Sequence, residues 1–271
     1  MTAQTVSPHK TTLDKGNAYW MARMAEAVYM KVDNGTRPDE EKILQGLKQE
    51  DDRFSSVTGF DNKSSQAALV EHNDYICMAF RGTDELEDWL DNIKITATKQ
   101  LFGHFHLGFW EAVQDIWPPM LACYEEAQKN GSRPLFITGH SLGGAMATIA
   151  AAIMMHENKA VASVYTFGQP RTMRPLTSMK FNTKCKNIFF RFHNNNDIVT
   201  RIPARIAGYS HVGTYLYISQ EETIYEEVGC WFRFLDYVDG AISDLGEKGM
   251  DMLKDHSMKN YLEAVKKWDF K

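Results

Sequence analysis

The residues best suited to chemistry surround Ser141, in the stretch Gly139-His140-Ser141-Leu142-Gly143-Gly144-Ala145. An apolar run at 134–138 precedes it and a long apolar segment follows it, so we predict a strand, a sharp turn and a helix. Glycines two residues before and two after the serine let such a turn close without collision. A short glycine and serine pattern also occurs in ordinary turns. The strand and helix expected on either side favour Ser141 as an exposed nucleophile.

A serine hydroxyl needs a histidine to take its proton and a carboxylate to orient that histidine. Asp197 follows the strand-like run 187–193, and polar residues beyond parallel strands share one edge of a sheet, although an aspartate there can also cap a turn. His211 and His256 compete as the base. His211 opens a strand, which in a parallel register puts it at the opposite edge, whereas an antiparallel strand would reverse this. His256 lies in a loop before an N-cap-like serine, so we predict the order Ser141, Asp197, His256 found in α/β-hydrolases.

The negative charge of a tetrahedral intermediate requires hydrogen-bond donors. The backbone N–H of Leu142 is one candidate, and Thr83, directly after the run 75–80, offers an N–H and a hydroxyl. Thr83 can equally cap the acidic helix that follows, and both roles are compatible. His104 and His106 could form a metal pair, but no third ligand recurs nearby, so we predict no metal and no cofactor.

These residues must be positioned by alternating strands and helices. We predict helices that start near Asn17, at 86–93, at 109–129 and at the sharp turn of Ser141. The C-terminal region beyond 219 is also predicted to be helical, including a last segment after His256, and Pro118-Pro119 is expected to kink or divide the helix at 109–129. The charged stretch 33–53 has the composition of turns. The strand-like runs lie at 66–71, 75–80, 134–138, 161–167, 187–193 and 211–219. This alternation predicts an α/β fold with a mostly parallel central sheet flanked by helices.

One predicted helix is short, acidic and strongly amphipathic. Its apolar residues recur at helical spacing, at Leu86, Trp89, Leu90 and Ile93. A movable cover and an ordinary helix fixed on the core share this pattern.

The whole chain has 271 residues with 44% hydrophobic content, so we predict a single domain over 17–271 after a flexible arm at 1–16. A net charge of −5 without a basic run argues against nucleic acid as a partner. Four scattered cysteines are predicted to be free thiols. We find neither a signal peptide nor an apolar run of about 18 residues, and so expect a cytoplasmic protein without a transmembrane segment, leaving export by a non-Sec route open.

Several motifs together resemble the class 3 lipases, serine esterases of the α/β-hydrolase fold. They run in the family's order through Phe80-Arg81-Gly82-Thr83 with Trp89, His106-Leu107-Gly108-Phe109, Gly139 to Ala145, Gly168-Gln169-Pro170-Arg171, Asn196-Asp197-Ile198-Val199, His211-Val212-Gly213 and Asp255-His256-Ser257-Met258. The resemblance implies the same triad, Thr83 and Leu142 as the oxyanion hole, and a structural role for His211. It also implies that the helix bearing Trp89 is a lid over the active site.

The expected activity is therefore ester hydrolysis through an acyl-enzyme, most simply of triacylglycerol at a lipid–water interface. Phospholipase A1 and mono- or diacylglycerol esterase activities are alternatives within the same family. A lipase-like protein that binds lipid without hydrolysis is an alternative of another class. The sequence leaves the oligomeric state open.

Overall fold

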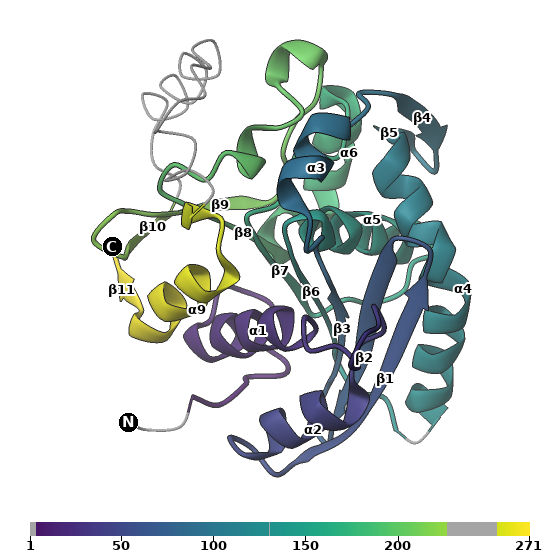
Figure 1. Cartoon of the computed structure of the whole chain (residues 1–271), viewed down its shortest axis with the longest axis vertical. Helices are drawn as coiled ribbons and strands as arrows, with labels where there is room; N and C mark the ends of the chain where they lie inside the picture. Colours follow the sequence, from purple (N-terminus) through teal and green to yellow (C-terminus); the bar gives the residue numbers. More distant parts are fainter. Residues whose placement is uncertain (1–3, 130, 227–253) are drawn as a thin grey trace.

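The computed structural model describes residues 4–129, 131–226 and 254–271. Its centre is a nine-stranded sheet in the order β1-β2-β3-β6-β7-β8-β9-β10-β11 (Figure 1). The five strands from β3 to β9 in this order are parallel to one another. Antiparallel pairs extend the sheet, through β1 and β2 on one side and β10 on the other. The predicted α/β fold with a mostly parallel sheet is confirmed.

The described strands and helices have the following bounds. The strands are β1 (Phe54–Asn62), β2 (Ser65–His72), β3 (Ile76–Phe80), β4 (Ala97–Gln100), β5 (Gly103–His106), β6 (Leu135–His140), β7 (Ser163–Phe167), β8 (Phe189–Asn194), β9 (Thr214–Ile218), β10 (Thr223–Glu226) and β11 (Asp269–Phe270). The α-helices are α1 (Lys15–Ala27), α2 (Glu40–Lys48), α3 (Leu86–Asn92), α4 (Leu107–Lys129), α5 (Leu142–His156), α6 (Pro175–Cys185) and α9 (Met258–Lys267). Short 3₁₀ turns are η1 (Lys186–Ile188), η2 (Val199–Arg201) and η3 (Arg205–Ala207).

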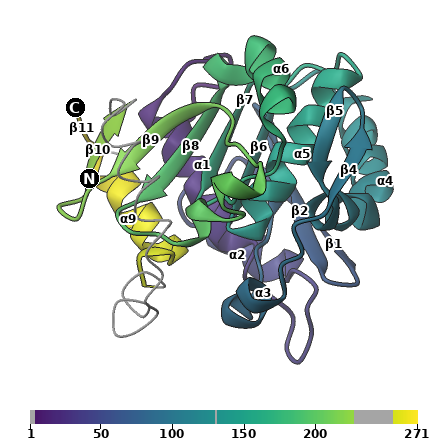
Figure 2. The same cartoon turned by 90° about the horizontal axis from the view of Figure 1, so that it is seen from above.

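Helices cover both faces of the parallel strands. Met78 and Phe80 of β3 belong to the core shared with α4 and α5, whereas Cys77 and Ala79 belong to the core shared with α1 and α9. Helices α1 and α9 lie side by side on the same face of the sheet (Figures 1 and 2). Because both faces are buried, these strands are continuous apolar runs rather than alternating ones, which is why they were recognisable from sequence.

Elements at the margins of the fold were missed or misjudged. Helix α2 lies in the stretch predicted as turns, and it buries only Ile43 and Leu47. The edge strand β1 is rich in serine, threonine and glycine and only partly buried, so its composition resembled a loop. The hairpin of β4 and β5, helix α6 and strands β10 and β11 were also not predicted. A further stretch of the predicted C-terminal helical region falls at 227–253, outside the described residues.

Helix α4 runs through Pro118 and Pro119 without the expected division. Proline lacks the N–H that would bond the carbonyl four residues earlier. The carbonyl left open by Pro119 is that of Asp115, which accepts a hydrogen bond of 2.8 Å from the side chain of Asn62. Both prolines are exposed, so their rings lie in solvent and the helix continues.

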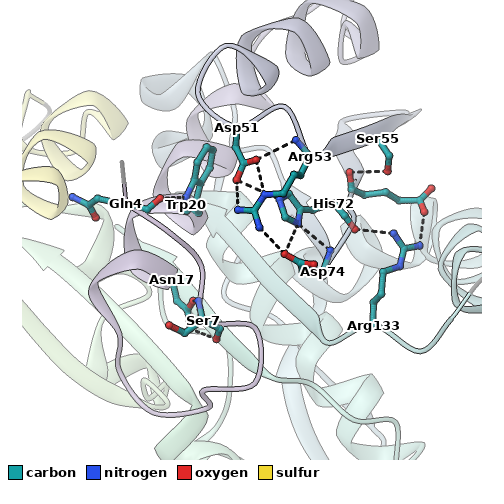
Figure 3. Close-up of polar contacts among 11 residues, drawn as sticks. Gln4, Ser7, Asn17, Trp20, Asp51, Arg53, Ser55, His72, Asp74 and Arg133 are labelled. Carbon is teal, nitrogen blue, oxygen red and sulfur yellow. Dashed lines mark hydrogen bonds and ion pairs between the residues drawn. The ribbon is translucent and has the colours of Figure 1, made fainter. Parts of the chain in front are cut away.

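The segment before α1 makes hydrogen bonds to that helix. The carbonyl of Gln4 accepts a hydrogen bond of 2.6 Å from the Trp20 indole, and the N–H of Ser7 donates to the Asn17 side chain at 2.8 Å (Figure 3). Asp14 caps α1, which begins at Lys15 rather than near Asn17. Residues 4–14, part of the arm predicted at 1–16, are therefore hydrogen-bonded to α1. The hydrogen bonds hold residues 4–14 against α1, the helix that packs on β6 and β7.

Candidate active site

Ser141 lies at a tight turn between β6 and α5. Its backbone angles are φ 58° and ψ −130°, a conformation that few non-glycine residues adopt. A Cβ on Gly139 would lie 2.2 Å from the carbonyl oxygen of Gly143, so the turn closes only because Gly139 has no side chain. The N–H of Ser141 donates to the carbonyl of Phe167 in β7 at 3.0 Å. The turn therefore has the geometry expected of a nucleophile elbow.

Asp197 and His256 meet beside this turn. His256 Nδ1 donates to Asp197 Oδ2 at 2.8 Å, and the carboxylate is completely buried. The same oxygen accepts a hydrogen bond of 2.6 Å from the Tyr261 hydroxyl, while Oδ1 accepts one of 2.9 Å from the Val199 N–H. Burial raises the pKa of Asp197, but His256 and the Tyr261 hydroxyl outweigh burial and hold that pKa below its ordinary value. The carboxylate is thus kept ionised, as a group that orients an imidazole must be.

The loops that carry these two residues are bound to each other. Asp255, next to His256, accepts hydrogen bonds from the Asn195 side chain at 3.0 Å and from the Asn196 N–H at 3.2 Å. Asn194, at the end of β8, donates to the Asp255 carbonyl at 2.8 Å. The asparagine-rich turn after β8 therefore positions the histidine as well as the aspartate.

Two side-chain atoms of the site are buried without a hydrogen-bond partner among the described residues: Ser141 Oγ and His256 Nε2. These are the atoms between which a proton would pass if His256 activated Ser141. Ser141 is only 1% exposed, so the structure is a covered state of the site.

The alternative histidines lie elsewhere. His211 precedes β9, which is parallel to β8, and its Nε2 donates to the carbonyl of Thr200 at 2.7 Å. His106 is buried against Phe109, whose N–H donates to its Nδ1, and burial lowers the pKa of His106 to about 4. Across the described ranges, no three His, Cys, Asp or Glu side chains are grouped as a metal site would require.

Thr83 and Leu142 line one cavity of about 310 Å³. Leu142 is the first residue of α5, so its N–H has no acceptor within the helix. The Thr83 hydroxyl accepts a hydrogen bond of 3.1 Å from the Glu85 N–H, which leaves its own proton to donate. Thr83 does not cap α3, whose N-cap is Glu85 without a side-chain hydrogen bond, so the capping role considered for Thr83 is not formed.

Trp89 of helix α3 and Ile93, the C-cap residue of that helix, form another part of this cavity's wall. Trp89 stacks on Phe109 at a ring separation of 6.1 Å, yet no residue of α3 is fully buried. The helix lies outside the layers formed by α1, α4 and α5 (Figure 2). An ion pair of 2.7 Å between Asp84 and Lys31 joins the residues just before α3 to the loop after α1. Leu86 and Leu90 are also only partly buried, so the apolar side of the helix is loosely packed.

Sequence reasoning missed three residues of the site. Tyr261 lies in α9, and its hydroxyl contacts Asp197. Gly168, with φ +60°, lies so close that a Cβ there would be 2.7 Å from Asp197 Oδ2. His140 precedes Ser141 in sequence, and its ring lies 4.5 Å from that of His256, with the two ring planes tilted by 32°. The glycine in Gly168-Gln169-Pro170 was the one available signal, since a glycine after a strand often permits close approach.

Comparison with known proteins gives a consistent family. A family model described as "Lipase (class 3)" matches residues 77–206. A secreted mono- and diacylglycerol lipase A of Penicillium cyclopium is 28% identical over 170 residues, which cover 61% of this chain and 55% of that protein. A secreted mono- and diacylglycerol lipase 1 of Fusarium solani is 26% identical over 263 residues, covering 90% and 75%. The first match thus spans little more than half of the relative's length.

Solved structures agree on the fold. A triacylglycerol lipase whose catalytic centre is described as a serine protease triad superposes with a TM-score of 0.64 at 21% identity, covering 74% of this chain and 78% of that one. At this identity the likeness establishes the α/β-hydrolase fold alone.

The relatives contradict the expected cytoplasmic location, because the Penicillium and Fusarium proteins are both named as secreted. The expectation rested only on the lack of a recognisable targeting segment. Within the described residues, no helix has the length and apolarity needed to cross a bilayer. The ordered motifs, the elbow, the fold and the similar proteins all point to the class 3 lipases, whose family model matches residues 77–206 of this chain.

Proposed function

We propose that this protein is a carboxylic ester hydrolase that acts on triacylglycerol through Ser141, Asp197 and His256. The observation that carries the proposal is the buried hydrogen bond of 2.8 Å between Asp197 and His256, next to a serine held at a strained elbow. A protein that only binds lipid needs neither the strain nor the buried carboxylate. Both are costly features that nucleophilic catalysis uses.

In the proposed reaction, Ser141 Oγ attacks the ester carbonyl carbon while His256 Nε2 takes the hydroxyl proton. The tetrahedral intermediate collapses when the C–O bond to the alcohol breaks, and His256 returns the proton to the departing oxygen. Water then attacks the acyl-enzyme by the same route and releases the carboxylic acid. Asp197 keeps Nδ1 protonated and stabilises the imidazolium formed in each step.

We assign the stabilisation of the charge that develops on the carbonyl oxygen to donors from two residues, Leu142 and Thr83. The Leu142 N–H is at the start of α5, where the helix dipole also favours negative charge. The Thr83 N–H and hydroxyl belong to the loop after β3, and Thr83 lines the same cavity as Leu142. Such donors act strongly because the site is shielded from water.

The lining of the cavity favours an acyl chain as the part of the substrate that binds next to Ser141. Trp89, Ile93, Phe109 and Leu142 give its wall apolar and aromatic surface. Mono- and diacylglycerol lipase activity is the second candidate, favoured by the names of the Penicillium and Fusarium relatives. Those names also support action outside the cell.

Hydrolysis of p-nitrophenyl butyrate by the wild type and by Ser141→Ala tests the proposal. We expect Ser141→Ala to lose turnover and to lose labelling by a fluorophosphonate probe, with an unchanged thermal unfolding midpoint. Ser163→Ala, a buried serine at the start of β7, is the matched control and should react normally. A folded Ser141→Ala enzyme that still turns over would refute the assignment. Triolein, diolein, monoolein and phosphatidylcholine then separate the substrate classes.

We further propose that α3 is a lid. Helix α3 is only partly buried and forms part of the cavity wall. Moving it away should therefore cost less free energy than moving a helix of the core, because less apolar surface would be exposed to water. Activity on a triglyceride should rise sharply as the substrate passes its solubility limit. A rate that stays proportional to monomeric substrate through that limit would count against a moving lid.

A further inference from the structure

His140 occupies the middle of a hydrogen-bond chain that joins the two sides of the site. Its Nδ1 is 2.8 Å from the Tyr29 hydroxyl, and its Nε2 is 2.6 Å from the backbone carbonyl oxygen of His256. The Tyr29 oxygen also accepts a hydrogen bond of 3.2 Å from the N–H of Gly82. The chain thus runs from the residue before Thr83 to the residue proposed as the base, passing directly beside Ser141.

Each hydrogen bond of His140 can have only one donor and one acceptor assignment. The His256 carbonyl can only accept, so His140 Nε2 must carry a hydrogen. Burial, followed by the nearby His256, lowers the pKa of His140 to about 3, so the ring is neutral and Nδ1 has a free lone pair. Tyr29 therefore donates to Nδ1, and burial raises the pKa of Tyr29 so that its hydroxyl keeps its proton.

The surroundings leave little freedom to the groups that this chain connects. A Cβ on Gly82 would be 2.8 Å from the His140 carbonyl oxygen and 2.9 Å from Ser141 Cβ, so the loop bearing Thr83 is pressed against the elbow. The His140 ring lies 4.5 Å from the His256 ring and supports one side of it. A neutral neighbour suits this place, because a cation there would repel the imidazolium that forms on His256.

We propose that His140 is a positioning residue, which fixes the Gly82-Thr83 oxyanion loop and the His256 loop relative to Ser141 through its two ring nitrogens. It touches neither substrate nor the reacting atoms. The inference rests on the proposed function, since it concerns the alignment of that reaction's donors and base. Small displacements of such groups reduce the rate of the chemical step much more than substrate binding.

Three substitutions at His140 separate the two hydrogen bonds. His140→Leu keeps a similar volume and removes both. His140→Gln can retain the donation to the His256 carbonyl, because its amide nitrogen extends to the position of Nε2. His140→Asn offers an oxygen near the position of Nδ1 and so can retain only the bond from Tyr29. Tyr29→Phe breaks the connection to Gly82 without altering the histidine.

We expect His140→Leu to lower kcat for p-nitrophenyl butyrate by about 10²-fold with KM changed less than about threefold. The fluorophosphonate labelling rate should fall in parallel, since it needs the same base and donors. His140→Gln and His140→Asn should each recover part of kcat, and Tyr29→Phe should lose about tenfold. A structural role alone would lower the unfolding midpoint of these variants without separating kcat from KM.

The outcomes are decisive in either direction. A folded His140→Leu enzyme with kcat within threefold of wild type overturns the inference, as does a loss confined to KM. If His140→Leu does not fold, Tyr29→Phe decides, and an unchanged kcat there overturns the coupling to the oxyanion loop. A wild-type protein inactive on every ester would instead refute the proposed function, so the two failures are distinguishable.

Discussion

Gly168 is the position where a single methyl group should most directly disturb the site. It follows β7 with φ +60°, a conformation that L residues rarely adopt. A Cβ added there would be 2.7 Å from Asp197 Oδ2 and 2.9 Å from both Cε1 and Nδ1 of His256. Gly168→Ala therefore inserts a methyl group against both members of the hydrogen-bonded pair.

The size of the effect follows from these distances. Comfortable contact between carbon and another heavy atom begins at about 3.5 Å, so the pair must retreat by roughly 0.6–0.8 Å. A misplacement of about 1 Å can cost on the order of 10² in rate. We expect Gly168→Ala to lower kcat by about 30–100-fold on this basis. The left-handed backbone adds about 1–2 kcal/mol of destabilisation.

Gly131→Ala is the matched control for backbone strain. Gly131 has φ +126°, also unfavourable for alanine, but an added Cβ there meets no atom within 4 Å. This variant should lose stability in urea unfolding while keeping the kcat of the wild type on p-nitrophenyl butyrate. If Gly168→Ala also kept a wild-type kcat, the pair would tolerate displacement and our reading of the site would be wrong.

Three further predictions concern the neighbouring groups. Tyr261→Phe removes a donor to buried Asp197, which should lower the free energy of unfolding by about 1–3 kcal/mol in urea titrations; an unchanged value would show that the bond is not formed. Thr83→Val should reduce kcat by about 10²–10³-fold and Thr83→Ser should restore it; equal rates for both would exclude the hydroxyl as a donor. Burial holds the pKa of His106 at about 4 and that of His140 at about 3 in the folded chain, below the ordinary 6.5, so below pH 6.5 the unfolded chain binds more protons. Stability should therefore fall from pH 6.5 towards pH 4, with His140 alone contributing roughly 2 kcal/mol of the loss by pH 5; a flat unfolding free energy between pH 7 and pH 5 would contradict this.

The sequence alone determined the parts of this protein that depend on local pattern. The strand, glycine and serine order around Ser141 predicts the elbow because a turn of that sharpness excludes side chains at fixed positions. Apolar runs buried on both faces predict the parallel strands, and the parallel order in turn brings Asp197 to the edge where Ser141 lies. The choice of His256 over His211 followed from the same reasoning about strand ends.

Only the tertiary structure decided which distant side chains touch. Tyr261 and Asp197 are 64 residues apart, and Tyr29 and His140 are 111 apart, so no periodicity along the chain connects them. The carbonyl of Asp115, which Pro119 leaves open in α4, accepts a hydrogen bond from the side chain of Asn62 in β1. Hydrogen bonds of this kind are set by how sheets and helices pack, and packing depends on the whole chain rather than on any one stretch. For that reason the sequence indicated the residues that we propose as nucleophile, acid and base, whereas the groups that hold them in place became visible only in the folded protein.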